Sequence, residues 1–448
     1  MLACNAGDGK PGNKKKDPPV GDSAVVEDTD PDVWEAGAPP VNLLMITIDT
    51  TRRDRLNSNG YTGRVTSPNI DGLLAGGLAL RKHHSCSTWT YPSFLCMLTG
   101  RDQVTLDFVP SNSKNGDVGT GPWEGDDLPS IANILHDEGF ATGLVWANGF
   151  LGPQRNMDQG HETEETGGGA NVISDKAMAR MDLLVEDGRP WFLHTHFNDP
   201  HGMYNPPDEY LEGYDDLAPC FDFDLTDRDN FKQMEASWPN FSEEEKAACT
   251  ERLSFRYDAC IRWVDDRIAL LLDNLDAHGQ REETLIVFGT DHGEEFGEHG
   301  TWEHGKAPFT QINASTIGFI YPPRIQAGDF TGLTTHEDVL PTILDLMDLE
   351  PPGVITGRIV GAGERQVAHA LVYKGQDTWQ AVITPEDKLV YHWEGDKYYF
   401  DRASDPDDLN NLYDPSDPRV LALWDELQPK VDEFEAYIDD AAPIDPGP

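Results

Sequence analysis

The sequence predicts an α/β fold: a large, mainly parallel sheet flanked by helices on both faces, with a smaller C-terminal antiparallel sheet plus one helix. Two observations support this prediction. Up to about residue 350, continuous apolar runs typical of doubly covered strands alternate with amphipathic helical patterns. After that point, short strand-like runs follow one another through turns, which is typical of an antiparallel sheet.

The predicted strands of the main sheet are the apolar runs at 41–48, 140–147, 191–197, 284–288 and 316–321. Helices between them carry recognisable start signals. Ser67 followed by Pro68 places a cap before a proline at the first helical position. The longest helix begins at Ser242, with Glu245 at the spacing of a capping box, and ends near Gly279.

The chain divides into three predicted parts. Residues 1–40 form a tail rich in Gly, Pro and acidic residues, with too few apolar side chains to order itself. Residues 41–350 form the main domain, and residues 351–440 form a C-terminal subdomain packed on it. Within that subdomain we expect strands at 367–373, 379–384, 388–393 and 397–401, then a helix over 420–437.

Composition excludes several classes of function. The 34 basic and 80 acidic side chains give a net charge of −46, which repels phosphate backbones, so no nucleic-acid partner is expected. No stretch of about 18 uncharged apolar residues is present, so no transmembrane segment is expected. We interpret the acidic excess as a solvated surface, with adaptation to high salt or to a cation-rich exterior as the alternative.

The cysteines bear on location. Leu2-Ala3-Cys4, followed by a Gly/Asp/Lys-rich tether, is similar to the mature start of a lipid-anchored export protein, although a chance cysteine explains it equally well. A periplasmic or extracellular protein, anchored through Cys4, is therefore the favoured prediction. Cys249 and Cys260 lie about 16 Å apart along one predicted helix, too far to bridge each other. The pairing of the cysteines is otherwise left open, with Cys220 and Cys249 as one conceivable pair.

Two predicted strands end in groups that can bind a cation. Asp49 ends the first strand, and Asp291 and His292 follow the strand at 284–288. Ligands in open parallel sheets bind at the carboxyl ends of strands, so these side chains are expected to converge. Two carboxylates and an imidazole suit a divalent cation. A helix cap and a solvated acidic loop are the alternative interpretations.

A hydroxyl is expected beside this cluster. Thr90 lies where a loop enters a helix, with Pro92 near the first helical position, and a helix N-terminus favours an anion. Coordination to a metal is one way to activate a hydroxyl as a nucleophile. Taken alone, this segment is better explained by Thr90 acting only as a helix cap.

Together these motifs resemble the sulfatase family of the alkaline phosphatase superfamily. The resemblance spans nearly everything after the tail, in the family's order. The matching segments are Asp49, Ser67-Pro68-Asn69-Ile70-Asp71, Thr90-Tyr91-Pro92-Ser93, Leu98-Thr99-Gly100, Asp199-Pro200-His201, Asp291-His292-Gly293, Gly297-Glu298-His299-Gly300, His304-Gly305, Asp338-Val339-Leu340-Pro341-Thr342 and 405–412. It implies an alkaline phosphatase-like fold, a catalytic domain over 41–350 and hydrolysis of a small anionic ester.

The departures from the family matter for the chemistry. Formylglycine sulfatases carry Cys or Ser in a Cys/Ser-x-Pro-Ser-Arg context, whereas this chain has Thr90 and, at the arginine position, Phe94. Oxidising a threonine gives a ketone, so no formylglycine is expected, and neither Cys86 nor Cys96 lies in the motif's frame. Formylglycine enzymes release sulfate by collapse of a hydrated aldehyde, a route that a sulfated threonine lacks. A phosphorylated threonine can be hydrolysed by water, so phosphate esters are favoured.

The resemblance implies one divalent metal ion held by Asp49, Asp291 and His292, with the Thr90 oxygen as fourth ligand. Thr50 stands where many relatives carry a second acid, and its role is left open. Calcium, magnesium, manganese and zinc all remain candidates for such a donor set.

The resemblance also implies roles for basic residues. His201 and His304 match positions near the transferring group, and either is a candidate general acid, with a structural loop histidine as the alternative. Arg52 is expected to pair with a nearby aspartate rather than with the substrate. His299 and His336 are interpreted as structural.

The predicted function is a metal-dependent hydrolase of phosphate or sulfate esters that forms a covalent Thr90 intermediate. The alternatives are a sulfuric ester hydrolase that works without formylglycine, a phospho-group transferase, and a non-catalytic metal-binding pseudoenzyme. The sequence leaves open the alcohol half of the substrate, the choice between monoester and diester, and the oligomeric state.

Overall fold

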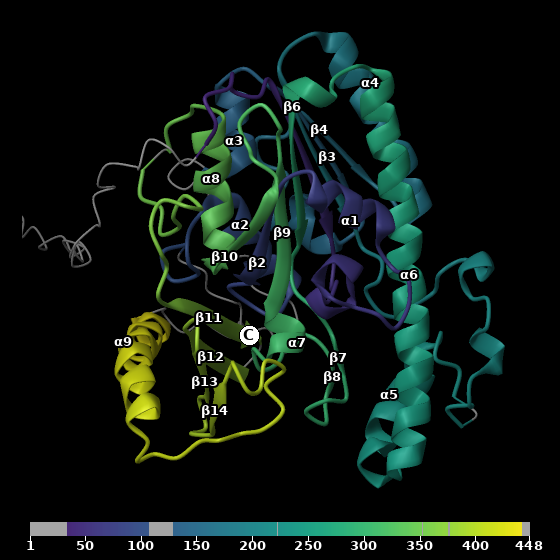
Figure 1. Ribbon diagram of the computed structural model, residues 1–448, viewed down its shortest axis with the longest axis vertical. Helices are drawn as coiled ribbons and strands as arrows, with labels where there is room; N and C mark the ends of the chain where they lie inside the picture. Colours follow the sequence, from purple (N-terminus) through teal and green to yellow (C-terminus); the bar gives the residue numbers. More distant parts are fainter. Residues whose placement is uncertain (1–33, 107–128, 222, 352, 375–376, 441–448) are drawn as a thin grey trace, which may run out of the picture.

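A computed structural model describes residues 34–106, 129–221, 223–351, 353–374 and 377–440 (Figure 1). Its main element is an eight-stranded sheet, as the sequence predicts. In spatial order the strands are Gly328–Thr335 (β10), Leu78–His84 (β2), Ala314–Ile320 (β9), Thr284–Thr290 (β6), Asn42–Ile48 (β1), Trp191–Phe197 (β5), Ala141–Trp146 (β3) and Thr163–Thr166 (β4). Only β9 runs antiparallel to its neighbours, so the sheet is mainly parallel.

Helices cover both faces of this sheet (Figure 1). Leu44 and Ile46 of β1 pack in one core with α1, α4 and α6, while Leu43 and Met45 point to the opposite core with α2, α3 and α8. The helices are Pro68–Ala75 (α1), Thr90–Thr99 (α2), Ile131–Asp137 (α3), Ala170–Asp187 (α4), Arg228–Ser237 (α5), Glu243–Ala277 (α6), Thr310–Asn313 (α7), Val339–Leu346 (α8) and Pro418–Asp440 (α9). Alternation along β1 therefore separates two cores, as expected for a sheet buried on both faces.

Local signals in the sequence are found in the structure. Pro68 is the first residue of α1, and Ser242 and Glu245 form the predicted capping box of α6. Three strands of the main sheet, β2, β4 and β10, were not predicted. β10 and β4 are the two edges of the sheet, and β4 and most of β10 are not buried, so neither has the continuous apolar run of a covered strand.

The predicted C-terminal sheet is also present. Its strands, in order, are Ala368–Lys374 (β11), Asp377–Ile383 (β12), Asp387–His392 (β13) and Lys397–Asp401 (β14), all antiparallel. α9 packs on this sheet through Leu423, Leu427 and Val431. The Leu371 N–H donates to the carbonyl of Cys86, just beyond the end of β2, so β11 lies at the carboxyl edge of the main sheet. A two-stranded ribbon, Glu295–Phe296 (β7) with Trp302–Glu303 (β8), lies at the same edge.

Two disulfides occur among the described residues. Cys220 pairs with Cys249, the candidate pair from the sequence, and Cys86 pairs with Cys96, which was not predicted. The second disulfide ties the loop after β2 to the middle of α2. Cys260 is buried and unpaired.

Some predictions are not tested by the structure. The proposed tail and Cys4 lie almost wholly outside the described residues, and the domain boundaries near residues 40 and 350 stay predictions. Across the described ranges, none of the helices is long and apolar enough to cross a membrane.

Candidate active site

The predicted cation ligands converge at the carboxyl edge of the sheet. β1 and β6 are parallel neighbours with Ile48 beside Thr290, so the residues that follow, Asp49 and Asp291, lie side by side. One ligand atom each from Asp49, Asp291 and His292 lies within 4.8 Å of the others, and all three side chains are fully buried. His292 Nε2 is 3.4 Å from Asp291 Oδ2 and 3.8 Å from Asp49 Oδ1.

This cluster fits a divalent cation. The N–H groups of Thr50 and His292 donate to Asp291 Oδ1, at 3.0 and 2.7 Å, whereas Asp291 Oδ2 and Asp49 Oδ1 are buried without a hydrogen-bond partner. Burial, and then the charge of Asp49, raise the pKa of Asp291 well above its usual range. Burial acts in the same direction on Asp49, but a hydrogen bond from His196 and the charge of His201 outweigh it and lower the pKa of Asp49. A bound cation would give Asp291 Oδ2 and Asp49 Oδ1 a partner, and it would offset the repulsion between the two carboxylates.

Thr90 is the first residue of α2, and its side chain faces this cluster. Its Oγ1 lies 3.4 Å from His292 Nε2 and 3.3 Å from Asn148 Nδ2. Trp89 occupies the N-cap position, so the alternative interpretation of Thr90 as the helix cap is wrong. The Thr90 hydroxyl is therefore available for chemistry at the candidate metal site.

Asn148 is a site residue that the sequence prediction missed. It lies two residues beyond β3, and its Nδ2 donates to both Asp49 Oδ2 and Thr90 Oγ1. Its Oδ1 accepts the N–H of Phe150 at 3.0 Å, which fixes the side chain. The strand-end rule that identified Asp49 applies equally here, so the position after β3 was the available signal.

Further polar contacts near Asp49 come from residues inside β1 and β5. Thr47 Oγ1 is hydrogen-bonded to both His194 Nε2 and His196 Nδ1, at 2.9 and 3.0 Å. His196 Nε2 in turn lies 3.4 Å from Asp49 Oδ2. Phe94, at the position of the family's arginine, is fully buried and meets the His196 ring edge-on at 5.0 Å. An aromatic ring thus stands at the position where the family resemblance predicts a cation.

The two predicted basic residues lie together beside the cluster. The His201 and His304 rings are 4.9 Å apart between centroids, and the His304 ring is 4.6 Å from that of His292. His304 Nδ1 is 2.9 Å from Glu294 Oε1. Burial raises the pKa of Glu294 to about 8 and lowers that of His304 to about 3, so both groups favour their neutral forms. Both histidines are only half-buried, which leaves them open to a ligand.

Arg52 has the structural role expected of it. Its guanidinium pairs with Asp54 at 2.7 Å and Glu298 at 2.5 Å.

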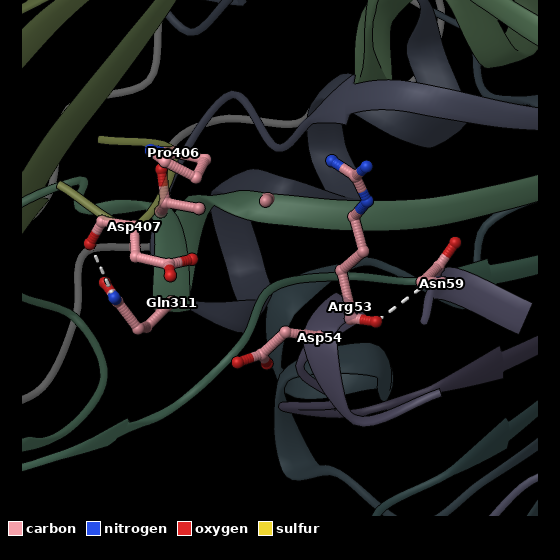
Figure 2. A pocket seen from close by; sticks show the side chains of 8 residues that line it. Arg53, Asp54, Asn59, Gln311, Pro406 and Asp407 are labelled. Carbon is pink, nitrogen blue, oxygen red and sulfur yellow. Dashed lines mark hydrogen bonds between the residues drawn. The ribbon is translucent and has the colours of Figure 1, made fainter. Parts of the chain in front are cut away.

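The next residue, Arg53, points instead into a separate cavity of about 250 Å³, shown in Figure 2. The cavity is lined by Arg53, Asp54, Asn59, Thr310, Gln311, Ala314, Pro406 and Asp407, and by none of the candidate metal ligands.

His299 and His336 also have the expected structural contacts. His299 is hydrogen-bonded to Glu295 and, through Nε2 at 2.7 Å, to the carbonyl of Asp408. His336 Nε2 lies 2.7 Å from the carbonyl of Asp291 and helps to hold the ligand loop.

Fold and site together define an α/β protein with a candidate metal centre and an adjacent threonine hydroxyl. Comparison with known proteins is more specific: the sulfatase family model matches residues 41–349. The chain belongs to the sulfatase family, and it is an ester hydrolase of that family. The family predicted from the motifs is thereby confirmed.

Individual relatives are distant but align over nearly the whole chain. The uncharacterised sulfatase YidJ of Escherichia coli is 24% identical over 451 residues, covering 88% of this chain and 89% of its own. A solved structure of BT4656 with D-glucosamine-2-N,6-O-disulfate has a TM-score of 0.71 at 18% identity, and the match covers 90% of this chain and 99% of that one. The phosphonate monoester hydrolase of Agrobacterium radiobacter has a TM-score of 0.67 at 18% identity, and the match covers 89% of this chain and 96% of that one. At these identities the structural matches establish the fold.

Proposed function

We propose that this protein hydrolyses phosphoric or phosphonic esters through a covalent Thr90 intermediate. The observation that supports the proposal is the position of Thr90 Oγ1, which contacts His292 and Asn148 at the edge of the Asp49–Asp291–His292 cluster. A hydroxyl held beside a cation site at a helix start is suited to attack an anionic ester.

A single divalent cation would be held by Asp49, Asp291 and His292, with the Thr90 oxygen as a further ligand. When bound, it lowers the pKa of the hydroxyl and draws charge from the ester oxygens. Two carboxylates and one imidazole favour calcium, magnesium or manganese, with zinc also compatible.

The protein's own groups account for the remaining steps. The Thr90 hydroxyl releases its proton to solvent, its oxygen bonds to phosphorus, and the bond from phosphorus to the alcohol oxygen breaks. Asn148 orients the hydroxyl. His201 and His304 are both candidates for donor of the proton that the departing alcohol takes: Nδ1 of each is engaged, by the carbonyl of Gly202 and by Glu294, which leaves Nε2 of each for the alcohol. Water then attacks phosphorus, the bond to the Thr90 oxygen breaks, and the hydroxyl is restored.

Phosphorus is favoured over sulfur because of Thr90. Formylglycine sulfatases release sulfate by collapse of a hydrated aldehyde, and a threonine has no such route. The likeness to a phosphonate monoester hydrolase is compatible with this choice. The second candidate is a sulfuric ester hydrolase working without formylglycine, which the sulfatase names of the aligned relatives favour.

Matched p-nitrophenyl esters test the proposal. Wild type and Thr90→Ala, both replenished with metal, are assayed on the phosphate, the phenylphosphonate and the sulfate. We expect hydrolysis of a phosphorus ester that Thr90→Ala abolishes, with phosphothreonine trapped at Thr90 by acid quench. Turnover of the sulfate alone would favour the second candidate, and metal binding without any turnover would favour a pseudoenzyme. Transfer to added glycerol in preference to water would indicate a transferase.

We also propose that the protein works outside the cytosol. Its two disulfides are typical of an oxidising compartment, in line with the periplasmic or extracellular location expected from the start of the sequence. Fractionation of cells that express the full natural gene tests this location.

A further inference from the structure

Lys374, the last residue of β11, reaches the active site from the second sheet. Its Nζ lies 2.5 Å, and its Cδ 2.8 Å, from the point where a Cβ on Gly305 would stand. The side chain therefore lies flat on the bare backbone of Gly305, directly after His304. Its Nζ is also 5.9 Å from the centre of the Trp89 ring, next to Thr90. Lys374 thus lies between the two segments that carry Thr90 and His304.

The ammonium of Lys374 is not paired with a carboxylate. Within the described part of the chain, no hydrogen bond or ion pair involves it; it faces the Trp89 ring, and the residue is exposed to solvent. Nearby Lys306 differs, because its Nζ donates to the carbonyl of Trp302 at 2.6 Å. The carboxylate of Glu303 is already paired with Arg228 and Lys232. The charge of Lys374 therefore remains available to an anion at the edge of the site.

The position of Lys374 indicates which part of a substrate it can meet. Thr90 Oγ1 is contacted by His292 and Asn148, and the His304 ring lies 4.6 Å from that of His292. Lys374 is not among the groups that contact Thr90 Oγ1; it lies over Gly305 and faces the Trp89 ring, at the exposed rim of the site. In an in-line displacement the leaving alcohol lies opposite the nucleophile, so a cation at the rim is placed to meet the alcohol half of the ester.

We propose that Lys374 binds an anionic group on the alcohol half of the substrate, so that the preferred ester carries a second negative charge such as a carboxylate, sulfate or phosphate. This inference rests on the proposed function. Gly305 leaves open the space that the Lys374 side chain occupies, and its φ of +73° favours glycine at this position in any case. An overall charge of −46 repels anionic substrates, which makes a local cation at the entrance more important.

The test uses two esters of the same shape, 4-carboxyphenyl phosphate and its neutral analogue 4-carbamoylphenyl phosphate. For wild type we expect a higher kcat/KM with the carboxylate. Lys374→Met should lower the ratio of the two kcat/KM values about tenfold, mainly through KM, since one charge-assisted contact is lost. Lys374→Arg should retain most of the preference. Lys306→Met, a matched loss of a lysine nearby, should leave the ratio as in wild type.

A binding measurement separates this inference from the proposed function. Calorimetry with 4-carboxyphenyl phosphate compares Thr90→Ala with Thr90→Ala/Lys374→Met, neither of which needs turnover. About tenfold weaker binding in the double variant would support the role of Lys374 even if wild type hydrolysed neither ester. Equal affinities, or a kcat/KM ratio that Lys374→Met leaves unchanged, would overturn the inference while leaving Thr90 chemistry intact.

Discussion

Replacing Asn148 is the sharpest test of the site geometry. The Asn148 amide donates to Asp49 Oδ2 and to Thr90 Oγ1, so it holds the proposed cation ligand and the proposed nucleophile in one arrangement. Asn148→Asp keeps the size of the side chain and the oxygen that accepts the Phe150 N–H. It replaces both donated hydrogen bonds with a carboxylate that faces Asp49.

The magnitude follows from these contacts. A hydrogen bond to a charged group contributes about 1.5–3 kcal/mol, and about 1.4 kcal/mol corresponds to a tenfold change in rate. Asn148→Ala should therefore lower kcat about 10- to 100-fold. Asn148→Asp should lower it further, because two carboxylates about 4 Å apart repel by about 4 kcal/mol at an effective dielectric constant of 20.

The assay measures kcat and KM on the aryl ester that wild type turns over fastest, with metal replenished, alongside thermal melting. Ser130→Ala is the control, because it removes a helix cap that accepts the Asn133 N–H and has no recorded contact with the candidate metal ligands. It should cost about 1 kcal/mol of stability without affecting kcat. If Asn148→Asp melted like this control and kept kcat within about threefold of wild type, the assigned geometry would be wrong.

Three further predictions concern the metal, pH and the cysteines. Chelation should abolish activity and lower Tm, and one equivalent of divalent cation should restore both, since it neutralises the buried pair Asp49 and Asp291; titration calorimetry checks the stoichiometry. Burial raises the pKa of Glu337 to about 7, so its contribution to stability is complete below its ordinary pKa of about 4.5 and is lost as pH rises through 7. Glu337→Gln should therefore raise Tm relative to wild type at pH 8 and leave it unchanged at pH 4.5, as read by calorimetry. Mass spectrometry after alkylation should show labelling of Cys260 only once the protein is unfolded, because it is buried while the two disulfides protect their cysteines.

The parts of the site that follow from parallel-sheet geometry could be predicted from the sequence. Asp49 and Asp291 each follow a run of apolar residues, and adjacent parallel strands bring their ends together. Thr90 was identified by its helix start and by the resemblance to the family. Asn148 follows a predicted strand as well, so the same rule would have found it.

Other contacts depend on information that a single sequence does not carry. His196 lies inside an apolar strand, and only the pairing of β5 with β1, which sets His196 beside Thr47, directs it to Asp49. Lys374 and Gly305 are distant along the chain and meet because the second sheet packs at the carboxyl edge of the first. The disulfide between Cys86 and Cys96 depends likewise on the bend from β2 into α2.

Phe94 stands at the position where the family resemblance predicts an arginine. In the proposed function the transferring group would therefore meet histidines and the amide of Asn148, with no guanidinium from that position. The cation that remains, Lys374, stands at the exposed rim of the site, where it acts on the alcohol. The site therefore concentrates its charge recognition on the leaving group, and selectivity among esters should depend on the alcohol more than on the number of charges at phosphorus.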